Sequence, residues 1–170
     1  MEAIGLSRAM TSFDVEAHAL DQRGRPDGFS GLVLETPRGI PILVSEPSFR
    51  DSVLRRVGRG NDLFFQVRKG SGSRVLLRTS MIRSLAKSPR ECMEMAADVA
   101  AYFCAEGVRW PPQEAEVEVM FTDARHVAKR GTRVGQLKDK KKLGTIVARP
   151  RRVAEMVRDA QEEQGWLDAF

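Results

Sequence analysis

The stretch Asn61-Asp-Leu-Phe-Phe-Gln-Val-Arg-Lys-Gly-Ser-Gly-Ser-Arg-Val-Leu-Leu-Arg78 decides how this chain is expected to fold. It contains two short apolar runs, 63–67 and 75–78, separated by a tight loop of Gly and Ser. Short apolar runs bounded by turn residues are typical of buried strands. The stretch therefore predicts two neighbouring strands joined by a glycine-rich turn.

The loop between these strands has the composition of an anion site. Gly70 and Gly72 can adopt backbone angles that are closed to other residues, so successive N–H groups can point at one anion. Arg68, Lys69 and Arg74 add three positive charges around that point. The loop predicts contact with a phosphate, although a plain hairpin turn would use the same glycines and serines.

Further strands are expected on both sides of this unit. The turn sequence Thr36-Pro-Arg-Gly39 separates two apolar runs and predicts a hairpin. Strict alternation over 115–122 predicts a half-buried strand whose inner face carries Val117, Val119 and Phe121. The expected strands besides the central pair are 29–35, 40–44, 115–122 and 145–148.

Three helices are expected. Apolar spacing over 48–57 is helical, and Pro150 opens a last helix with Val153, Met156, Val157 and Ala160 on its inner side. The clearest helix follows Ser88-Pro-Arg-Glu91, which predicts Ser88 at the N-cap and Pro89 at the first helical position. Its expected apolar face consists of Cys92, Met95, Ala96, Val99 and Phe103.

Strands and helices do not alternate regularly along the chain, which favours the α+β class over a doubly wound sheet. The 170 residues fit one domain, with a mixed or antiparallel sheet packed by the Ala-rich helix and with a C-terminal helix. We expect a loosely packed N-terminal extension over 1–28, the main domain over 29–150, and a helix with an apolar tip over 151–170.

Charge is strongly segregated along the chain. Residues 50–90 hold eleven Lys or Arg against two acids, and residues 131–152 hold eight against one. Residues 91–118 hold seven acids against one Arg, and 153–170 hold five acids against one Arg. Such a chain presents one strongly positive region, for which polyanions are the natural partners.

Other features narrow the class of protein. No apolar run approaches the roughly 18 residues of a membrane span. The two cysteines, Cys92 and Cys104, have no metal-binding spacing and indicate buried thiols in a reducing compartment, the cytoplasm or an organelle stroma. No targeting signal is visible, and we expect no cofactor.

Five segments together resemble a known family, the NFACT-R domain. Their order along the chain is that of the family, and they span about 29–150. The segments are Asp62-Leu-Phe-Phe-Gln-Val, the Gly-Ser-Arg-Val-Leu-Leu that follows the loop, Glu94-Met-Ala-Ala-Asp-Val-Ala-Ala-Tyr102, Glu116-Val-Glu-Val-Met-Phe-Thr-Asp-Ala-Arg-His-Val-Ala-Lys-Arg-Gly131 and Gly144-Thr-Ile-Val-Ala-Arg-Pro150. The NFACT-R domain is the RNA-binding module of ribosome-associated quality-control factors and also occurs as a stand-alone protein. The resemblance implies an α+β domain that binds tRNA or ribosomal RNA.

The chain departs from the family pattern in places. Gln66 and Arg74 stand where the family commonly has His, so histidine-dependent chemistry is not expected. Val134-Gly135 stands where Pro-Gly is common. The larger members also carry an N-terminal domain and a long coiled coil, for which this sequence is too short, so their synthesis of peptide tails is not carried over.

The expected function is non-enzymatic RNA binding through phosphate contacts. The loop lacks the Gly-Lys-Ser/Thr ending of a nucleotide-triphosphate site. Phe64 and Phe65 are adjacent, so one of them is a candidate for stacking on a base. The candidate nucleic-acid-binding residues are Arg68, Lys69, Gly70, Gly72, Arg74, Arg125, Lys129, Arg130, Arg133, Lys138, Lys140, Lys141 and Lys142.

Two other functions remain open at the level of sequence. The chain could be a protein adaptor or assembly factor that uses the acidic helix and the apolar tip with Trp166, Leu167 and Phe170. Less favoured is a metal-dependent hydrolase using Glu116 and Glu118, which we interpret as solubilising acids on an edge strand. The ribosome is the expected larger partner, and the oligomeric state is left open.

Overall fold

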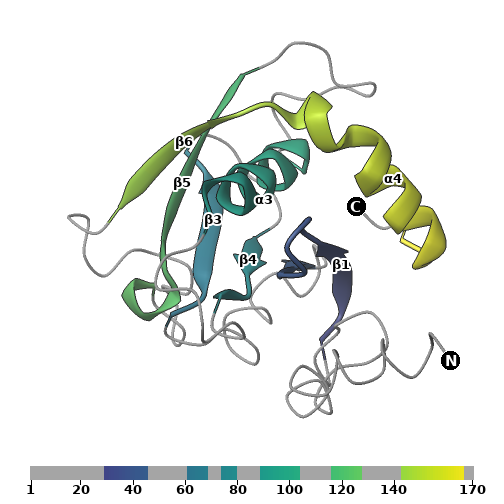
Figure 1. Cartoon of the computed structure of the whole chain (residues 1–170), viewed down its shortest axis with the longest axis horizontal. Helices are drawn as coiled ribbons and strands as arrows, with labels where there is room; N and C mark the ends of the chain where they lie inside the picture. The colour runs from purple at the N-terminus through teal and green to yellow at the C-terminus, as the bar shows by residue number, and fades with distance from the viewer. Residues whose placement is uncertain are drawn as a thin grey trace, which may run out of the picture.

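The computed structural model describes residues 29–45, 61–68, 74–79, 89–103, 116–127 and 143–166. These residues form an α+β unit built on a six-stranded sheet in the order β1-β2-β4-β3-β5-β6 (Figure 1). Every pairing between neighbouring strands is antiparallel. The predicted fold class is confirmed.

The strands fall close to their predicted positions, because their apolar residues face a common core. β1 and β2 form the expected hairpin, and β3 and β4 flank the glycine-rich loop. The bounds are β1 Gly31–Glu35, β2 Pro41–Ser45, β3 Leu63–Val67, β4 Val75–Leu77, β5 Val117–Asp123 and β6 Gly144–Ala148. The expected helix over 48–57 lies outside the described residues.

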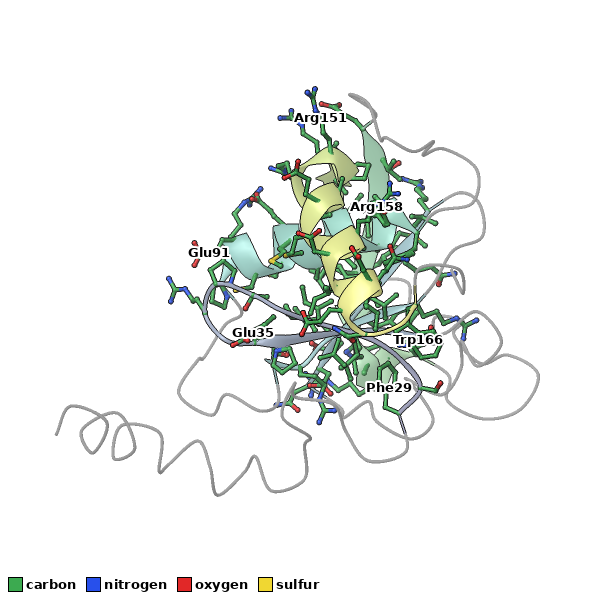
Figure 2. The ribbon with its side chains drawn as sticks, turned by 90° about the vertical axis from the view of Figure 1, so that its right-hand side faces the viewer. Phe29, Glu35, Glu91, Arg151, Arg158 and Trp166 are labelled. Atoms are coloured by element: carbon green, nitrogen blue, oxygen red, sulfur yellow. The ribbon has the colours of Figure 1, made fainter. Side chains whose placement is uncertain are left out.

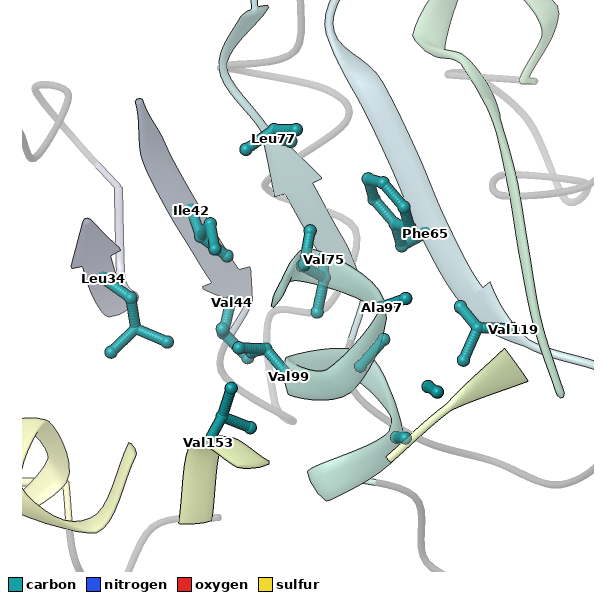
Figure 3. Close-up of a cluster of buried hydrophobic side chains, with 14 of the residues drawn as sticks. Leu34, Ile42, Val44, Phe65, Val75, Leu77, Ala97, Val99, Val119 and Val153 are labelled. Atoms are coloured by element: carbon teal, nitrogen blue, oxygen red, sulfur yellow. The ribbon is translucent and has the colours of Figure 1, made fainter. Parts of the chain in front are cut away.

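One face of the sheet packs against helix α3, Arg90–Tyr102. Figure 3 shows side chains from β1 to β5 meeting Ala97 and Val99 of this helix. Cys92, Ala96 and Val99 are fully buried on its inner side, and Met95 and Phe103 pack at the margin, as the apolar spacing predicted. The small Ala side chains let the helix axis approach the sheet closely, so most of the apolar area of the strands is removed from water.

The start of α3 differs from the prediction. Pro89 occupies the N-cap rather than the first helical position, because its ψ of 134° is extended. Its carbonyl accepts hydrogen bonds from the N–H groups of Cys92 and Met93, at 3.0 and 3.1 Å. Ser88 lies outside the described residues, and the side chain of Glu91 pairs with Arg38.

The opposite face of the sheet carries a second, smaller apolar cluster, which contains Val33, Leu43, Phe64 and Leu76. Phe65 points to the α3 side and is fully buried, and Phe64 is 3% exposed. The expectation that one of these two rings is available to a base was wrong. Adjacent residues of a strand point to opposite faces, and both faces of β3 are covered at this point.

β6 depends on a glycine at its first position. Gly144 is paired with Phe121 of β5, and a Cβ placed on Gly144 would lie within 3 Å of the Phe121 ring. That ring also stacks on Phe65, with 5.8 Å between ring centroids. The Phe121 ring therefore occupies the space next to Gly144 that a side chain at this position would fill.

The chain after β6 returns to the α3 side of the sheet. A short 3-10 helix, η7 (Pro150–Val153), leads into α4 (Ala154–Glu163). Val153 and Val157 are buried in the same core as the sheet, as predicted, with Met156 and Ala160 at its margin. Figure 2 shows this segment running from Arg151 at one end to Trp166 at the other.

Asp98 of α3 holds the start of this C-terminal segment. Its side chain is 4% exposed and accepts the backbone N–H of Arg149 at 2.7 Å. The guanidinium of Arg152 donates to the same carboxylate, at 2.9 and 3.0 Å. Burial raises the pKa of Asp98 above its ordinary value of 3.8, against the lowering by these hydrogen bonds.

The raised pKa makes the stability of the fold depend on pH in a defined direction. The folded state holds the Asp98 proton more tightly than the unfolded state, so this contribution to stability is complete below about pH 3.8 and is lost as pH rises through the raised pKa. In Asp98→Asn, an amide oxygen still accepts the Arg149 N–H but does not titrate. We expect the unfolding free energy of the wild type, minus that of Asp98→Asn, to fall between pH 3.5 and 7, measured by urea denaturation. A difference that rises over this range would contradict the account.

Candidate nucleic-acid interface

Arg68 lies immediately after β3, at the point where the chain enters the glycine-rich loop. Its backbone N–H donates to the carbonyl of Glu118 at 3.0 Å, which continues the β3–β5 ladder by one residue. Its guanidinium donates to the carboxylate of Glu118 at 2.7 Å, and both side chains are about half exposed. An exposed pair of this kind contributes only about 0–1 kcal/mol, so the guanidinium can exchange this carboxylate for another anion at little cost.

A second pair of the same kind lies beside the first. Arg149, at the end of β6, donates to Glu116 at 3.1 Å, with 60% and 57% of the two side chains exposed. Glu116 and Glu118 are two residues apart, and alternation places them on the same side of the sheet. The two acids therefore form a central strip with one arginine on each side.

Strand direction brings Arg68, Arg74 and Arg149 to one end of the sheet, which we call the arginine end. β3 and β6 are both antiparallel to β5, so their C-terminal ends coincide, and β4 begins beside the end of β3. Two strand spacings, about 10 Å across the sheet, and an offset of two residues along β5 separate Arg68 from Arg149.

The backbone of Arg74 is fixed at this end by Ser45. The Ser45 N–H donates to the Arg74 carbonyl at 3.1 Å, and the Arg74 N–H donates to the Ser45 hydroxyl oxygen at 3.3 Å. The glycine-rich loop therefore leaves and re-enters the sheet between two anchored residues, Arg68 and Arg74.

Arg125 does not join this group. It lies in a 3-10 turn, η4 (Ala124–His126), which follows β5 at the opposite end of the sheet, where Asp123 pairs with Leu63. The five residues of β3 separate the two ends by roughly 16 Å. The guanidinium of Arg125 is exposed and donates to Asp123 at 2.9 Å. Of the predicted site residues, the structure thus brings Arg68 and Arg74 together and leaves Arg125 apart.

The other ten predicted residues lie outside the described part of the chain. They are Lys69, Gly70, Gly72, Lys129, Arg130, Arg133, Lys138, Lys140, Lys141 and Lys142. The ends of the two segments that contain them are nevertheless fixed. The 69–73 segment is anchored at the arginine end, and the 128–142 segment is anchored at the opposite end, by Val127 and Leu143.

Sequence reasoning missed Arg149 as a site residue, although the basic count over 131–152 included it. Arg151 and Arg152 follow it and are exposed at the start of η7. The missing information was strand direction, because only the pairing of β6 with β5 places Arg149 two strands from Arg68. The density of arginine at the end of a predicted strand was the available signal.

The acidic strip has no features of a metal site. Glu116 and Glu118 each pair with an arginine, and no cluster of three His, Cys, Asp or Glu side chains occurs among the described residues. The interpretation of their strand as an edge was wrong, because β5 lies between β3 and β6. The true edge, β6, could not be recognised before the pairing was known.

Of the two cysteines, the one that the structure describes is buried in the core, as predicted. Cys92 is a free thiol with no exposed surface, on the α3 face toward the sheet. His126 lies 3.9 Å from Asp123 in the separate η4 turn. Cys104 lies outside the described residues.

Neither helix of the described ranges could cross a membrane. Both α3 and α4 are too short and too polar to span a bilayer.

Comparison with known proteins identifies a fold neighbour. No protein-family model matches the chain, and no curated protein matches it. Among solved structures, it is similar to the C-terminal part of the fibronectin/fibrinogen-binding protein from Streptococcus suis, with a TM-score of 0.58 and 18% sequence identity. The match covers 81% of this chain and 52% of that structure, so the chain spans about half of the neighbour's length. At this identity the likeness shows a shared fold.

Proposed function

We propose that this chain is a non-enzymatic RNA-binding domain that holds the phosphate backbone of a tRNA or a ribosomal RNA. The arginine end carries the proposal, because three arginines that flank three different strands lie together at one end of the sheet. Lys69 and the basic segment 129–142 are proposed to extend the contact beyond the described residues.

The side chains at the arginine end suit exchangeable contacts with phosphate. Arginine can donate two parallel hydrogen bonds to a phosphate, as it does to a carboxylate. Glu116 and Glu118 pair with Arg149 and Arg68 at this surface. When RNA binds, each arginine exchanges its carboxylate partner for a phosphate oxygen. The loss of the ion pair costs little free energy, because both of its side chains are exposed.

Recognition of the backbone is favoured over reading of bases. Phe64 and Phe65 are buried, and the large hydrophobic side chain that is exposed in the described ranges is the aliphatic Val147. Without an aromatic surface for stacking there, contacts with phosphate and sugar supply the affinity, and sequence discrimination is expected to be weak.

Membership of the NFACT-R family and a role at the ribosome are part of this proposal. The α+β sheet with its packed helix is compatible with the family resemblance of the five segments. Support for RNA itself comes from the charge pattern, since residues 50–90 and 131–152 concentrate nineteen basic residues against three acids.

Neutralising either the arginines or the glutamates of the two ion pairs tests the proposal. Arg68→Gln combined with Arg149→Gln removes two cations, and we expect binding of bulk tRNA to weaken about tenfold or more at 0.1 M salt. Glu118→Gln combined with Glu116→Gln breaks the same two ion pairs but leaves both arginines, so binding is expected to tighten. Fluorescence anisotropy of labelled tRNA measures both.

The two double variants are matched, because each removes the same pair of surface interactions. If both weaken RNA binding equally, the ion pairs serve the fold and the arginines do not contact phosphate. Far-ultraviolet circular dichroism confirms that each variant keeps its folded structure.

Protein binding is a second candidate, since the fold neighbour is named for binding fibronectin or fibrinogen. The adaptor hypothesis relied on the acidic helix and the apolar tip. Trp166 packs against the core, and Asp98 of the helix is engaged with Arg152, so both are partly committed within the fold. Deleting residues 167–170 would abolish partner binding by an adaptor and would leave RNA binding unchanged.

A further inference from the structure

The two edges of the sheet are treated differently. The outer edge of β1 is closed by the side chain of Gln164, which follows α4. The Gln164 amide oxygen accepts the Val33 N–H at 3.0 Å, and its amide nitrogen donates to the Val33 carbonyl at 2.7 Å. One side chain thus occupies both outward backbone groups at the centre of this edge and prevents another strand from pairing there.

The outward groups of the other edge, β6, follow from the ladder pattern. The Arg68 N–H donates to the Glu118 carbonyl, so Glu118 directs its backbone groups toward β3. Hydrogen-bonded positions alternate in antiparallel strands, so Val117, Val119 and Phe121 direct theirs toward β6. Their partners in β6 are Ala148, Ile146 and Gly144. The N–H and C=O groups of Thr145 and Val147 therefore point away from the sheet.

This edge is open over the two residues. Apart from the β5–β6 ladder, no hydrogen bond reaches Thr145 or Val147 in the part of the chain that the structure describes. Both residues are exposed, and the Val147 side chain is the exposed large hydrophobic of the described ranges, at 55%. The Arg149 N–H donates to Asp98 and ends the open stretch. Figure 1 shows β6 at the opposite side of the sheet from β1 and α4.

The charge around β6 selects among possible occupants. Residues 138–152 hold seven Lys or Arg against Asp139, and the basic residues lie on both sides of the strand. In a second copy of this chain pairing antiparallel through β6, Leu143 of one copy would lie opposite Arg149 of the other, so the chain that enters β6, which carries Lys142 next to Leu143 in the sequence, would approach the arginines that follow β6. Like charges at such distances are destabilising. A partner with acidic residues on both sides of a short apolar segment avoids this repulsion.

We infer that the β6 edge binds an extended, acidic peptide segment of another protein, which adds a seventh strand to the sheet. Backbone hydrogen bonds to Thr145 and Val147 supply affinity, and an apolar side chain of the peptide covers Val147. The acidic residues of the peptide complement Arg149, Arg151 and Arg152, which follow β6, and the lysines that precede it in the sequence. The hydrogen bonds of this site use the backbone of β6 and not the ion pairs of the arginine end, although its flanking charges, Arg149 and the lysines of 138–142, are shared with the proposed RNA contact.

A defined probe tests the inference. The fluorescein-labelled peptide Glu-Glu-Val-Thr-Val-Thr-Glu-Glu is titrated with the full chain, and binding with a Kd below about 1 mM is expected. The control peptide Glu-Glu-Pro-Thr-Pro-Thr-Glu-Glu has the same charge but lacks two N–H donors, and is expected to bind at least about tenfold more weakly. Equal binding of the two peptides would overturn the inference in favour of general charge attraction.

Variants of the protein give an independent readout. Val147→Pro removes an outward N–H without removing a donor from the β5–β6 ladder, so it is tolerated at an edge but is expected to weaken peptide binding at least about tenfold. Val147→Thr keeps the N–H and the branched side chain and is expected to bind nearly as the wild type does. In the wild type, saturating peptide should slow hydrogen exchange of the Thr145 and Val147 amides. Unchanged exchange at both amides, or a dimer of the free chain paired through β6, would overturn the inference.

Discussion

Replacing Phe65 with Ala is expected to lower the free energy of unfolding by about 3–5 kcal/mol. Among the residues that the structure describes, Phe65 is the largest side chain with no exposed surface, and it lies under α3 at the centre of β3. Its ring also stacks on Phe121, which covers Gly144 at the start of β6. The substitution therefore leaves a cavity and removes support from the strand pair that carries Arg149.

Urea denaturation of the full chain measures this loss. Because small domains are stable by only about 5–15 kcal/mol, the variant is expected to be partly unfolded at 37 °C. Phe65→Leu is the matched control, since it keeps most of the apolar volume and should cost much less. A loss below about 1 kcal/mol in Phe65→Ala would show that the core is not centred on β3.

Replacing Lys140, Lys141 and Lys142 together with Ala is expected to weaken binding to every RNA by about a hundredfold at 0.1 M salt. Each lysine that neutralises a phosphate releases roughly 0.7 counterions from a single strand, and removing three such lysines gives this factor. These lysines lie outside the described residues, so none of the core contacts of the described ranges involves their side chains.

The measurement compares tRNA, a ribosomal RNA fragment and a homopolymer under one buffer. Since lysine contacts with phosphate carry no base information, the three affinities should fall by similar factors. A loss confined to one sequence would contradict backbone recognition and would require contacts with bases. Replacing Arg8, Arg23 and Arg25 together with Ala removes the same number of charges outside both basic stretches and serves as the control for general loss of positive charge.

Much of the fold could be predicted because local signals and the core agree. The strand bounds at 63–67 and, to within one residue, at 75–77 follow from apolar runs beside turn residues, and the inner faces of β5, α3 and α4 follow from their periods of apolar residues. In these elements, each residue that the period places inward also meets the common core.

Other features depend on partners that are far apart in the sequence. The bond between Asp98 and the N–H of Arg149 spans 51 positions, and the Gln164 bonds to Val33 span 131. No local pattern in the chain encodes these pairs. The helix start was misplaced by one residue, because Pro89 has an extended ψ and caps the helix with its carbonyl, and the predicted partner Glu91 pairs instead with the distant Arg38.

The candidate site shows the same division. Arg68 and Arg74 could be predicted from the composition of the loop, and both are at the arginine end. Arg149 was missed and Arg125 was grouped with them, because only strand order and direction show which ends of the sheet coincide. Strand alternation predicts that Glu116 and Glu118 share one face. Which arginines they pair with, Arg149 and Arg68, depends on the register of the neighbouring strands.

The most direct test of RNA binding by the arginine end and the basic segments is the salt dependence of tRNA affinity. Four to eight phosphate contacts predict a slope of log affinity against log salt between roughly −3 and −6, so affinity falls by about fifty- to several thousandfold between 50 and 200 mM monovalent salt. The Arg68→Gln, Arg149→Gln double variant is expected to reduce the steepness of this slope by more than one unit. An affinity that does not change with salt, or a slope that the double variant leaves unaltered, would contradict the account.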